Sequence, residues 1–306
     1  MNDTARIIVN IGAPDAPTPE SASKFLAEFL SDKRVISTPL PLRKILAFVI
    51  SRKRCRNYAR ELSQIFADGK HPLKKFTESL AQKVAKIDGN PVEVAYRYGT
   101  DSIPEVVERL KKRGAKRFLF VPLYPQHTRS TIESAAAKIR RTLKRGQYRI
   151  AKAYFDDHDY ISALASTIPS KCQTLIASFH SVPLEHAKNS PYQSQCRRTA
   201  ELLAKYLGIK RVELAWQSQM PKGEWLTPTT REVAENLIAH GEKHAVVIAP
   251  SFACDCSETL RELGETLAAQ WKAAGGESLF VCRCLNDSDA HARLIAKLFK
   301  NLESIL

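Results

Sequence analysis

Two short segments, far apart in the sequence, carry side chains that can both bind a metal ion and accept a proton. Residues 178–183 contain His180, and residues 255–260 contain Glu258. Each segment lies just past an apolar, strand-like run. One imidazole and one carboxylate are too few ligands for a closed structural metal site. They suit a site that holds a metal ion briefly while protons move, because both groups exchange protons and bind divalent cations.

Three glutamates follow one another along the second segment. Glu258 on its own would be a first-turn helix carboxylate that interacts with the helix dipole. Glu262 and Glu265 lie four and seven residues further on, so we expect the three to share one helix face. A solvated acidic face is the simple explanation. The alternative is a ladder of carboxylates, starting next to Asp255, that conducts protons or hydrated metal ions.

The elements that must position these residues alternate regularly along the chain. Apolar runs rich in β-branched residues predict strands at residues 7–11, 92–96, 118–123, 150–155, 175–179, 212–216, 245–249 and 279–282. Amphipathic patterns predict helices at residues 21–30, 104–113, 195–207, 230–240 and 258–271. Strands that read as solid apolar runs and alternate with helices belong to parallel sheets covered on both faces. The sequence therefore predicts the α/β class.

The predicted strands divide into two equal groups near residue 150. A chain of 306 residues also exceeds the length at which one core usually stops growing. We therefore expect two Rossmann-like domains, residues 1–150 and 151–306, each a parallel sheet flanked by helices. Ligands bind beyond the carboxyl ends of such strands, and both chemically interesting segments follow predicted strands. An active-site cleft between the two domains is the resulting prediction.

Residues 39–74 interrupt this alternation. The segment is too long for a simple connection and surrounds an apolar run at residues 45–50 with Arg and Lys. We expect it to form a basic lip over the cleft. The formal net charge of the chain is +15. A surface of this kind could bind nucleic acid, an anionic membrane or an acidic small molecule. No nucleic-acid-binding motif accompanies it, and a solvated basic face is the simple alternative.

The cysteines and the hydropathy pattern indicate the compartment. The seven cysteines are never spaced C-x-x-C, so we expect free thiols, as in a reducing environment. Zinc or an iron–sulfur cluster could be bound by the two C-x-C pairs, Cys254 with Cys256 and Cys282 with Cys284. Buried thiols near strand ends are the commoner outcome. No apolar run approaches the roughly 20 residues needed to cross a bilayer. We expect a cytoplasmic protein, with peripheral contact to the inner face of the cell membrane as an alternative.

Several segments resemble those of the ferrochelatases, which insert Fe²⁺ into a porphyrin during haem synthesis. The similar segments cover nearly the whole chain in the family's order. They are residues 10–15 (N-I-G-A-P-D), 26–36, 122–131 (with Y-P-Q), 178–183 (S-F-H-S-V-P), 217–230 (with Q-S and W-L-T-P), 255–260 (D-C-S-E-T-L) and 284–287 (C-L-N-D). The resemblance implies two Rossmann-like halves around a cleft, in agreement with the predicted strands.

The resemblance also implies roles for individual residues. His180 matches the histidine proposed to accept pyrrole protons or meet the metal, and Glu258 matches the essential carboxylate on the opposite wall. Both are therefore predicted to be catalytic and metal-binding. Porphyrin contacts are predicted for Ile11, Tyr58, Arg97, Tyr98, Tyr124, Tyr192 and Trp225. The path for protons or metal is predicted to include Asp255, Glu262 and Glu265.

The implied reaction inserts Fe²⁺ into protoporphyrin IX, gives protohaem and releases two protons. Bending the ring in the cleft would expose its nitrogen lone pairs to the metal. Iron is then a substrate, and no permanently bound cofactor is expected. Arg129 stands where animal members carry a cluster-ligand cysteine, so an iron–sulfur cluster is not expected. Ile11 stands where coproporphyrin-using enzymes place a tyrosine, which favours protoporphyrin.

Three alternatives stay open. A class II chelatase could insert another metal, such as cobalt or nickel, into an earlier tetrapyrrole. A ferrochelatase could use coproporphyrin III. A non-catalytic porphyrin or haem carrier would bind the ring but would tolerate the loss of His180 and Glu258. The expected partners are protoporphyrin IX and Fe²⁺, with an anionic membrane as a further candidate and without nucleic acid.

Overall fold

The computed structural model describes residues 3–210, 212–220 and 222–305. The chain forms two compact units that are not contiguous in sequence. The first unit takes the residues up to Leu123, residues 128–152 and the residues from Asp287 onward, and the second takes residues 124–127 and 153–286. The main transition after Lys152 lies close to the predicted cut near residue 150. The end of the chain, however, returns to the first unit, where the prediction assigned it to the second.

The sheet of the first unit is parallel, with the strand order β2-β1-β3-β4. Its strands are β1 (Thr4–Asn10), β2 (Val92–Tyr96), β3 (Arg117–Pro122) and β4 (Tyr148–Ile150). Every residue of β1 is buried. This is expected of a strand that has neighbours on both sides and helices on both faces.

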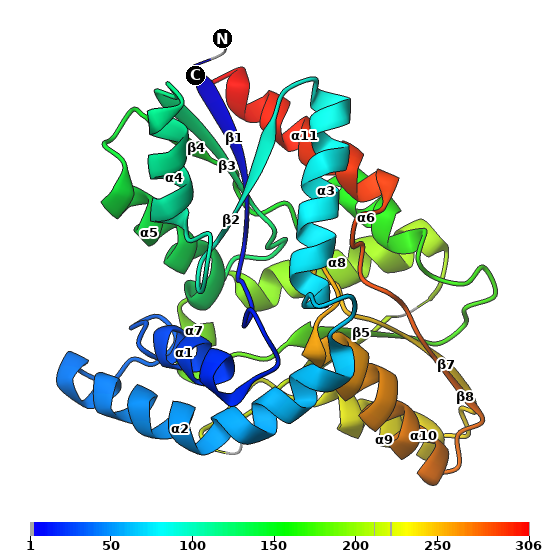
Figure 1. Ribbon diagram of the computed structural model, residues 1–306. Helices are drawn as coiled ribbons and strands as arrows, with labels where there is room; N and C mark the ends of the chain where they lie inside the picture. The colour runs from blue at the N-terminus through cyan, green and yellow to red at the C-terminus, as the bar shows by residue number, and fades with distance from the viewer. Residues whose placement is uncertain (1–2, 211, 221, 306) are drawn as a thin grey trace. The chain divides into compact units, whose positions relative to one another are not determined.

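The first unit also contains helices. They are α1 (Pro19–Leu30), α2 (Leu40–Ile65), α3 (Pro72–Asp88), α4 (Ile103–Lys112), the π-helix η1 (Arg129–Glu133), α5 (Ser134–Thr142) and α11 (Asp289–Glu303). Figure 1 shows α3 and α11 together on one face and α4 and α5 on the other. Helix α4 begins at a capping box formed by Ser102 and Glu105, which satisfies free backbone N–H groups at its first turn.

The sheet of the second unit repeats this topology, with the order β6-β5-β7-β8 and parallel pairing throughout. Its strands are β5 (Leu175–His180), β6 (Val212–Gln217), β7 (His244–Ile248) and β8 (Ser278–Val281). Its helices are α6 (His158–Ala165), α7 (Leu184–Lys188), α8 (Tyr192–Leu207), α9 (Thr230–Ala239), the π-helix η2 (Glu258–Leu267) and α10 (Ala268–Ala273).

The core of the second unit has two layers because side chains alternate along each strand. On one face, Ile176, Ala215 and Val247 pack with Leu263 and Trp271 from η2 and α10. On the other face, the rings of Phe179 and Trp216 pack at 5.9 Å between centroids, with their planes tilted by 47°. The sheet is therefore a rigid base for the residues at its carboxyl edge.

Both sheets have a switch point between their two central strands, where successive connections leave in opposite directions. In the first unit it lies between β1 and β3, and in the second between β5 and β7. Ligands of open parallel sheets bind outside the carboxyl ends of the strands at this point. The loop after β1 and the last residue of β5, His180, lie there.

One expected strand needs correction. The fourth strand is β4 at Tyr148–Ile150, not residues 150–155, because it pairs only with residues 118–120 of β3 before the chain leaves the sheet. Residues 39–74 contain the 26-residue helix α2 and the first turn of α3, and that they form a lip stays a prediction. Within the described part of the chain, no helix is both long and apolar enough to cross a membrane.

Candidate active site

His180 is fixed at the switch point of the second unit by several contacts. Its backbone N–H donates to Oγ of Ser251, 2.9 Å away in the segment after β7. Its carbonyl oxygen accepts a hydrogen bond from Oη of Tyr192 at 2.7 Å. The imidazole Nδ1 lies 2.6 Å from the carbonyl oxygen of Ser181, and the ring packs against Phe252 at 5.8 Å between centroids. Backbone and ring are thus both positioned by the fold.

The contact with Ser181 also decides which ring nitrogen of neutral His180 carries the proton. A carbonyl oxygen can only accept a hydrogen bond, so Nδ1 must be the donor. In the neutral imidazole the free lone pair then lies on Nε2. Because the side chain is only partly buried, Nε2 can accept a proton or bind a metal ion.

Glu258 begins η2, and Gln217 connects it to the strand that carries His180. Nε2 of Gln217 donates to the carbonyl oxygen of Glu258 at 3.0 Å, and its Oε1 accepts from Oγ of Ser178 at 2.6 Å. Its backbone carbonyl accepts from the N–H of Ser181 at 2.8 Å. His180 and Glu258 therefore belong to the same unit. They do not come from different domains, as opposite walls of an interdomain cleft would require.

Ser218 holds the next glutamate of η2. Its N–H donates to Oε1 of Glu262 at 2.7 Å, and its Oγ donates to Oε2 at 2.6 Å. The backbone of Ser218 has φ +63°, in the left-handed region that is uncommon for residues other than glycine. Both donors thus reach one carboxylate. They are neutral groups, so they orient Glu262 without cancelling its charge.

Glu265 does not lie with the other two glutamates. Its carboxylate accepts from Nε of Arg261 at 3.4 Å, and its side chain is 62% exposed. A π-helix hydrogen-bonds each residue to the fifth one along, so its turn is wider than that of an α-helix. Residues seven apart therefore do not return to the same face. The predicted shared face is therefore wrong for Glu265, and its place on the path stays a prediction.

Asp255 is buried and is occupied by structural hydrogen bonds. Its Oδ2 accepts from Nε of Arg283 at 2.5 Å and from Nδ2 of Asn286 at 2.7 Å, and its Oδ1 accepts from the N–H of Cys284 and from Thr259. Burial alone would raise its pKa, but these bonds and the charge of Arg283 outweigh it and hold the pKa below its ordinary value. Asp255 thus fastens the loop after β8 to the start of η2.

The cysteines near this site are neutral thiols. Burial raises the pKa of Cys256, and the adjacent charge of Glu258 raises it further. Burial likewise raises the pKa of Cys284, and it raises that of Cys282 to about 12. Metal binding needs the thiolate form. Among the residues that the structure describes, no group of three or more His, Cys, Asp or Glu side chains could hold a metal ion.

The aromatic residues predicted to contact porphyrin in the second unit differ in exposure. Trp225 is partly buried, and its Nε1 donates to the carbonyl oxygen of Lys222 at 3.0 Å. Tyr192 is almost completely buried and supports the backbone of His180. Tyr124 is also buried. Among these three aromatic residues, Trp225 is therefore the most exposed, and the porphyrin contact of Tyr192 stays a prediction.

The predicted porphyrin-contact residues of the first unit lie in the loop after β1, in α2 and after β2. Ile11 and Tyr58 are partly exposed. Arg97 follows β2 and is also partly exposed, whereas the next residue, Tyr98, is completely buried. Gly12 has φ +93°, and a Cβ there would lie 2.1 Å from the carbonyl oxygen of Tyr98. Only glycine allows the loop after β1 to approach the β2 loop this closely.

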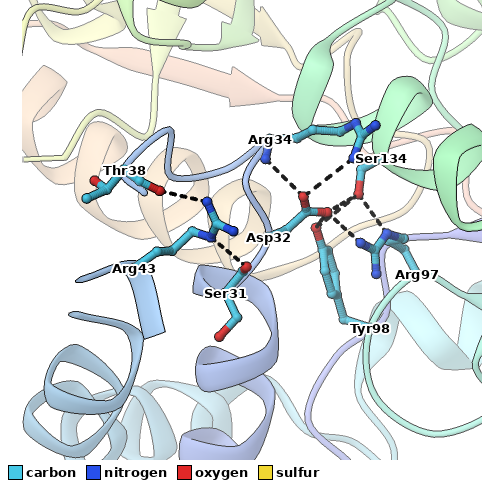
Figure 2. Close-up of polar contacts among 8 residues, drawn as sticks. All are labelled: Ser31, Asp32, Arg34, Thr38, Arg43, Arg97, Tyr98 and Ser134. Atoms are coloured by element: carbon cyan, nitrogen blue, oxygen red, sulfur yellow. Dashed lines mark hydrogen bonds and ion pairs between the residues drawn. The ribbon is translucent and has the colours of Figure 1, made fainter. Parts of the chain in front are cut away.

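Sequence reasoning missed the residues that hold these side chains in place. Asp32 and Ser134 bind Arg97 (Figure 2), and Ser251 binds the backbone of His180. Asp32 lies in one of the segments that resemble the ferrochelatases, directly after a predicted helix. Its place in that segment was the one sequence feature that could have indicated a role for Asp32. Residue type alone could not, because Asp and Ser are common in loops, where their side chains bond the local backbone.

A match to a known protein family extends over almost the whole chain. The model of the ferrochelatase family matches residues 3–302. The chain belongs to the ferrochelatase family. The resemblance noted in the sequence is thereby confirmed, and the chain is a porphyrin metal chelatase.

Individual relatives of this ferrochelatase-family chain match over nearly their full length. Ferrochelatase 1 of Shewanella oneidensis is 36% identical over 312 residues, which cover 95% of this chain and 93% of that protein. The ferrochelatase of Bradyrhizobium diazoefficiens is 36% identical over 313 residues, which cover 95% of this chain and 91% of that protein. SirB from Bacillus subtilis with Fe³⁺ superposes with a TM-score of 0.61 at 12% identity, over 98% of this chain and 97% of that one. The last likeness shows the fold alone and confirms two Rossmann-like domains of chelatase type.

Proposed function

We propose that this enzyme inserts Fe²⁺ into protoporphyrin IX, giving protohaem and two protons. Its membership of the ferrochelatase family makes it a porphyrin metal chelatase, and the choice of protoporphyrin is the proposed part. The observation that supports the chemistry most directly is the free Nε2 lone pair of His180 beside a helix that begins with Glu258. Iron enters as a substrate, and the proposal needs no permanently bound cofactor or iron–sulfur cluster.

The proposed reaction assigns proton transfer and metal handling to the two groups. Two pyrrole N–H bonds break, and the ring nitrogens bind Fe²⁺ as a dianion. Nε2 of neutral His180 and the carboxylate of Glu258 are the proposed proton acceptors, and the same two groups are the proposed transient ligands of the arriving metal. The hydrogen-bond donors to Glu262 are neutral, so they orient its carboxylate without pairing it with a positive charge. Weak oxygen and imidazole ligation lets the ion leave for the ring.

That both units contribute to one porphyrin site stays a prediction from the family resemblance. Arg97 of the first unit is the proposed cationic contact, and Trp225 of the second is the proposed aromatic contact. The ring is large, planar and anionic at its propionates. An arginine and a partly exposed indole are suitable partners for such a molecule.

The decisive experiment is anaerobic incubation of the purified protein with protoporphyrin IX and Fe²⁺, followed by absorbance. We expect the porphyrin bands to give way to those of protohaem. Parallel reactions with coproporphyrin III, and with Co²⁺ and Ni²⁺ and an earlier tetrapyrrole, test the other substrates. Faster turnover of any of these would replace protoporphyrin in the proposal. Tight porphyrin binding without metal insertion would instead identify a carrier.

The exposed side of α2 supports peripheral contact with an anionic membrane. One side of the helix is buried at intervals of four residues, through Ala47, Ser51, Cys55 and Ala59. The early turns expose the large apolar side chains Leu40, Leu42, Ile45, Phe48 and Val49. Exposed cations accompany them at Lys44, Arg52, Lys53, Arg54 and Arg56. Apolar side chains that insert between lipids, flanked by cations that attract anionic headgroups, are typical of helices that lie on a membrane surface.

Co-sedimentation with liposomes tests this contact. We expect binding to vesicles that contain phosphatidylglycerol, weaker binding at high salt, and little binding to phosphatidylcholine alone. Phe48→Glu should reduce binding. The matched control is Ile87→Glu on α3, because Ile87 is also exposed but lies outside α2. Absence of salt-sensitive binding to the anionic vesicles would remove the membrane from the proposal.

A further inference from the structure

A buried carboxylate after α1 is paired with the arginine that follows β2 (Figure 2). Oδ2 of Asp32 lies 2.5 Å from Nη2 of Arg97 and 3.1 Å from Oη of Tyr98. The side chains of Asp32 and Arg97 are 5% and 11% exposed. Such a pair is screened little by solvent, so its geometry is fixed more strongly than that of a surface ion pair.

Ser134 closes the cluster by bridging the two charges. Its Oγ accepts from Nε of Arg97 at 2.6 Å and donates to Oδ2 of Asp32 at 2.5 Å. The ring of Tyr98 covers the guanidinium, with 4.2 Å from the central carbon to the ring centroid. Nε and Nη2 are therefore both committed, and the guanidinium plane is fixed. Among the described residues, Nη1 has no hydrogen-bond acceptor within the protein.

The position of Asp32 is itself secured by the loop between α1 and α2. The backbone N–H of Arg34 donates to Oδ1 of Asp32 at 2.9 Å. Arg43, buried at the start of α2, donates to the carbonyl oxygens of Ser31 and Thr38 at 2.9 and 2.7 Å. Figure 2 shows these contacts on either side of Asp32. The carboxylate is thus set in place before any ligand arrives.

The protonation states agree with this role. Burial would raise the pKa of Asp32, but the bonds from Ser134 and Arg34 and the charge of Arg97 outweigh it and lower the pKa. Burial raises the pKa of Tyr98, so its hydroxyl stays a donor to Asp32. At neutral pH the cluster therefore holds one anion and one cation, and its net charge does not oppose the approach of a divalent metal ion.

We propose that Asp32, together with Ser134, is a positioning residue that fixes Arg97 for contact with the porphyrin. The inference rests on the proposed role of Arg97 in porphyrin binding. A free arginine side chain has many rotamers and loses them when it binds a ligand. The cluster imposes that loss during folding, so porphyrin binding does not have to immobilise the side chain again.

A double-mutant cycle tests this inference. The porphyrin KM and kcat are measured anaerobically at saturating Fe²⁺ for the wild type, Asp32→Asn, Arg97→Ala and the double variant. We expect Asp32→Asn to raise the porphyrin KM roughly three- to tenfold, the size that follows when one long side chain must be immobilised on binding. In the Arg97→Ala background the same substitution should leave KM unchanged. Ser134→Ala, which keeps both charges, should give a smaller rise in KM.

The control is Asp68→Asn, which removes an exposed carboxylate of the same unit that pairs with Lys75. It should leave the porphyrin KM unchanged. A purely structural Asp32 would instead lower the melting temperature in both backgrounds and leave KM of the folded protein unaltered. An equal effect of Asp32→Asn with and without Arg97 would also overturn the inference.

Two further outcomes separate the inference from the function on which it rests. If Arg97→Ala leaves KM unchanged in an active chelatase, the roles of Arg97 and Asp32 are both wrong and the chelatase function stands. If the wild type inserts no metal, the same cycle is measured as the protoporphyrin dissociation constant by fluorescence quenching. Coupling between Asp32 and Arg97 in that constant would support the inference for a carrier, and its absence would reject it.

Discussion

The two sheets have the same strand order, but different kinds of groups hold the candidate site residues at their carboxyl edges. In the first unit, Arg97 and Asp32 neutralise each other in a buried cluster. In the second unit, His180 and Glu262 are held by neutral groups, namely the carbonyl of Ser181 and the N–H and hydroxyl of Ser218. The first edge thus carries a self-compensated cation. The second carries the lone pair of His180 and the carboxylate of Glu262, both held by neutral groups, beside the separate ion pair of Asp255 and Arg283.

This difference separates the tasks that a porphyrin chelatase needs. A neutralised ion pair fixes geometry without offering a group that binds protons or cations. Neutral donors around a carboxylate orient it and leave its charge to attract a metal ion. We therefore expect substitutions in the second unit to affect proton and metal steps, whereas those around Arg97 affect porphyrin binding.

The largest effect is expected for His180→Ala. The change removes the Nε2 lone pair but leaves the backbone bonds to Ser251 and Tyr192 in place. A positioned proton acceptor typically contributes about 10²- to 10⁴-fold to a rate, so kcat should fall by at least about 100-fold while the porphyrin KM changes little. The control is His240→Ala, because His240 is exposed and bonds only its own helix through Asn236. Retention of most activity by His180→Ala would contradict the proposed chemistry of this edge.

Glu258→Gln should have the next largest effect. Glutamine keeps the size of the side chain and the carbonyl contact with Gln217 but removes the charge that attracts a cation. We expect KM for Fe²⁺ to rise roughly tenfold or more, as is typical when a group that tunes a metal site is lost. Glu265→Gln should be close to wild type, because Glu265 is exposed and paired with Arg261. Equal effects of the two substitutions would mean that bulk charge, not position, attracts the metal.

The fold could be predicted from the sequence because its signals are local and repeated. Continuous apolar runs predicted the bounds of most strands to within a few residues. Their alternation with helices predicted the parallel sheets. The signal was weakest at β4, which pairs along a few residues at an edge. The return of α11 to the first unit could not be predicted, since it depends on packing against α3 and not on any local pattern.

The site could be predicted only in part. His180 and Glu258 stand out because their chemistry is unusual just past a strand. The predicted boundary near residue 150 already placed both in the second domain, but the contact through which Gln217 joins β6 to η2 could not be read from the sequence. Glu265 was placed on the same helix face as Glu258 and Glu262 because α-helical spacing was assumed. The sequence shows no pattern that predicts a π-helix there. Tyr192 has the chemistry of a ligand contact, but its burial behind His180 is a tertiary property.

Asp255 is the buried carboxylate of the second unit, and Asp255→Asn tests whether it has a structural role like that of Asp32. Asparagine cannot accept from Arg283, Asn286 and Cys284 together, so a donor is left unsatisfied. We expect a loss of about 1–3 kcal/mol in the free energy of unfolding at pH 7. The lowered pKa of Asp255 stabilises the fold above the ordinary carboxyl range near pH ~3.9, and this contribution is lost as pH falls through the lowered value.

Urea unfolding of the wild type and Asp255→Asn at several pH values measures this effect. The difference in stability should be largest near neutral pH and should shrink as the pH falls below about 4. Asp156→Asn is the control, since Asp156 is exposed in the same unit. If Asp255→Asn loses much of its activity but keeps its stability, Asp255 takes part in proton or metal transfer and its role is not structural.

The smallest effect is expected at Ser218, where two substitutions separate a hydrogen bond from backbone strain. Ser218→Ala removes the hydroxyl bond to Glu262 but keeps the N–H bond, so stability should fall by about 0.5–1.5 kcal/mol. Ser218→Gly removes the same bond and also relieves the left-handed backbone, which costs roughly 1–2 kcal/mol for residues with a side chain. Glycine should therefore be the more stable variant. If the two lose the same stability but only one raises KM for Fe²⁺, the backbone of Ser218, and not its hydroxyl, orients Glu262.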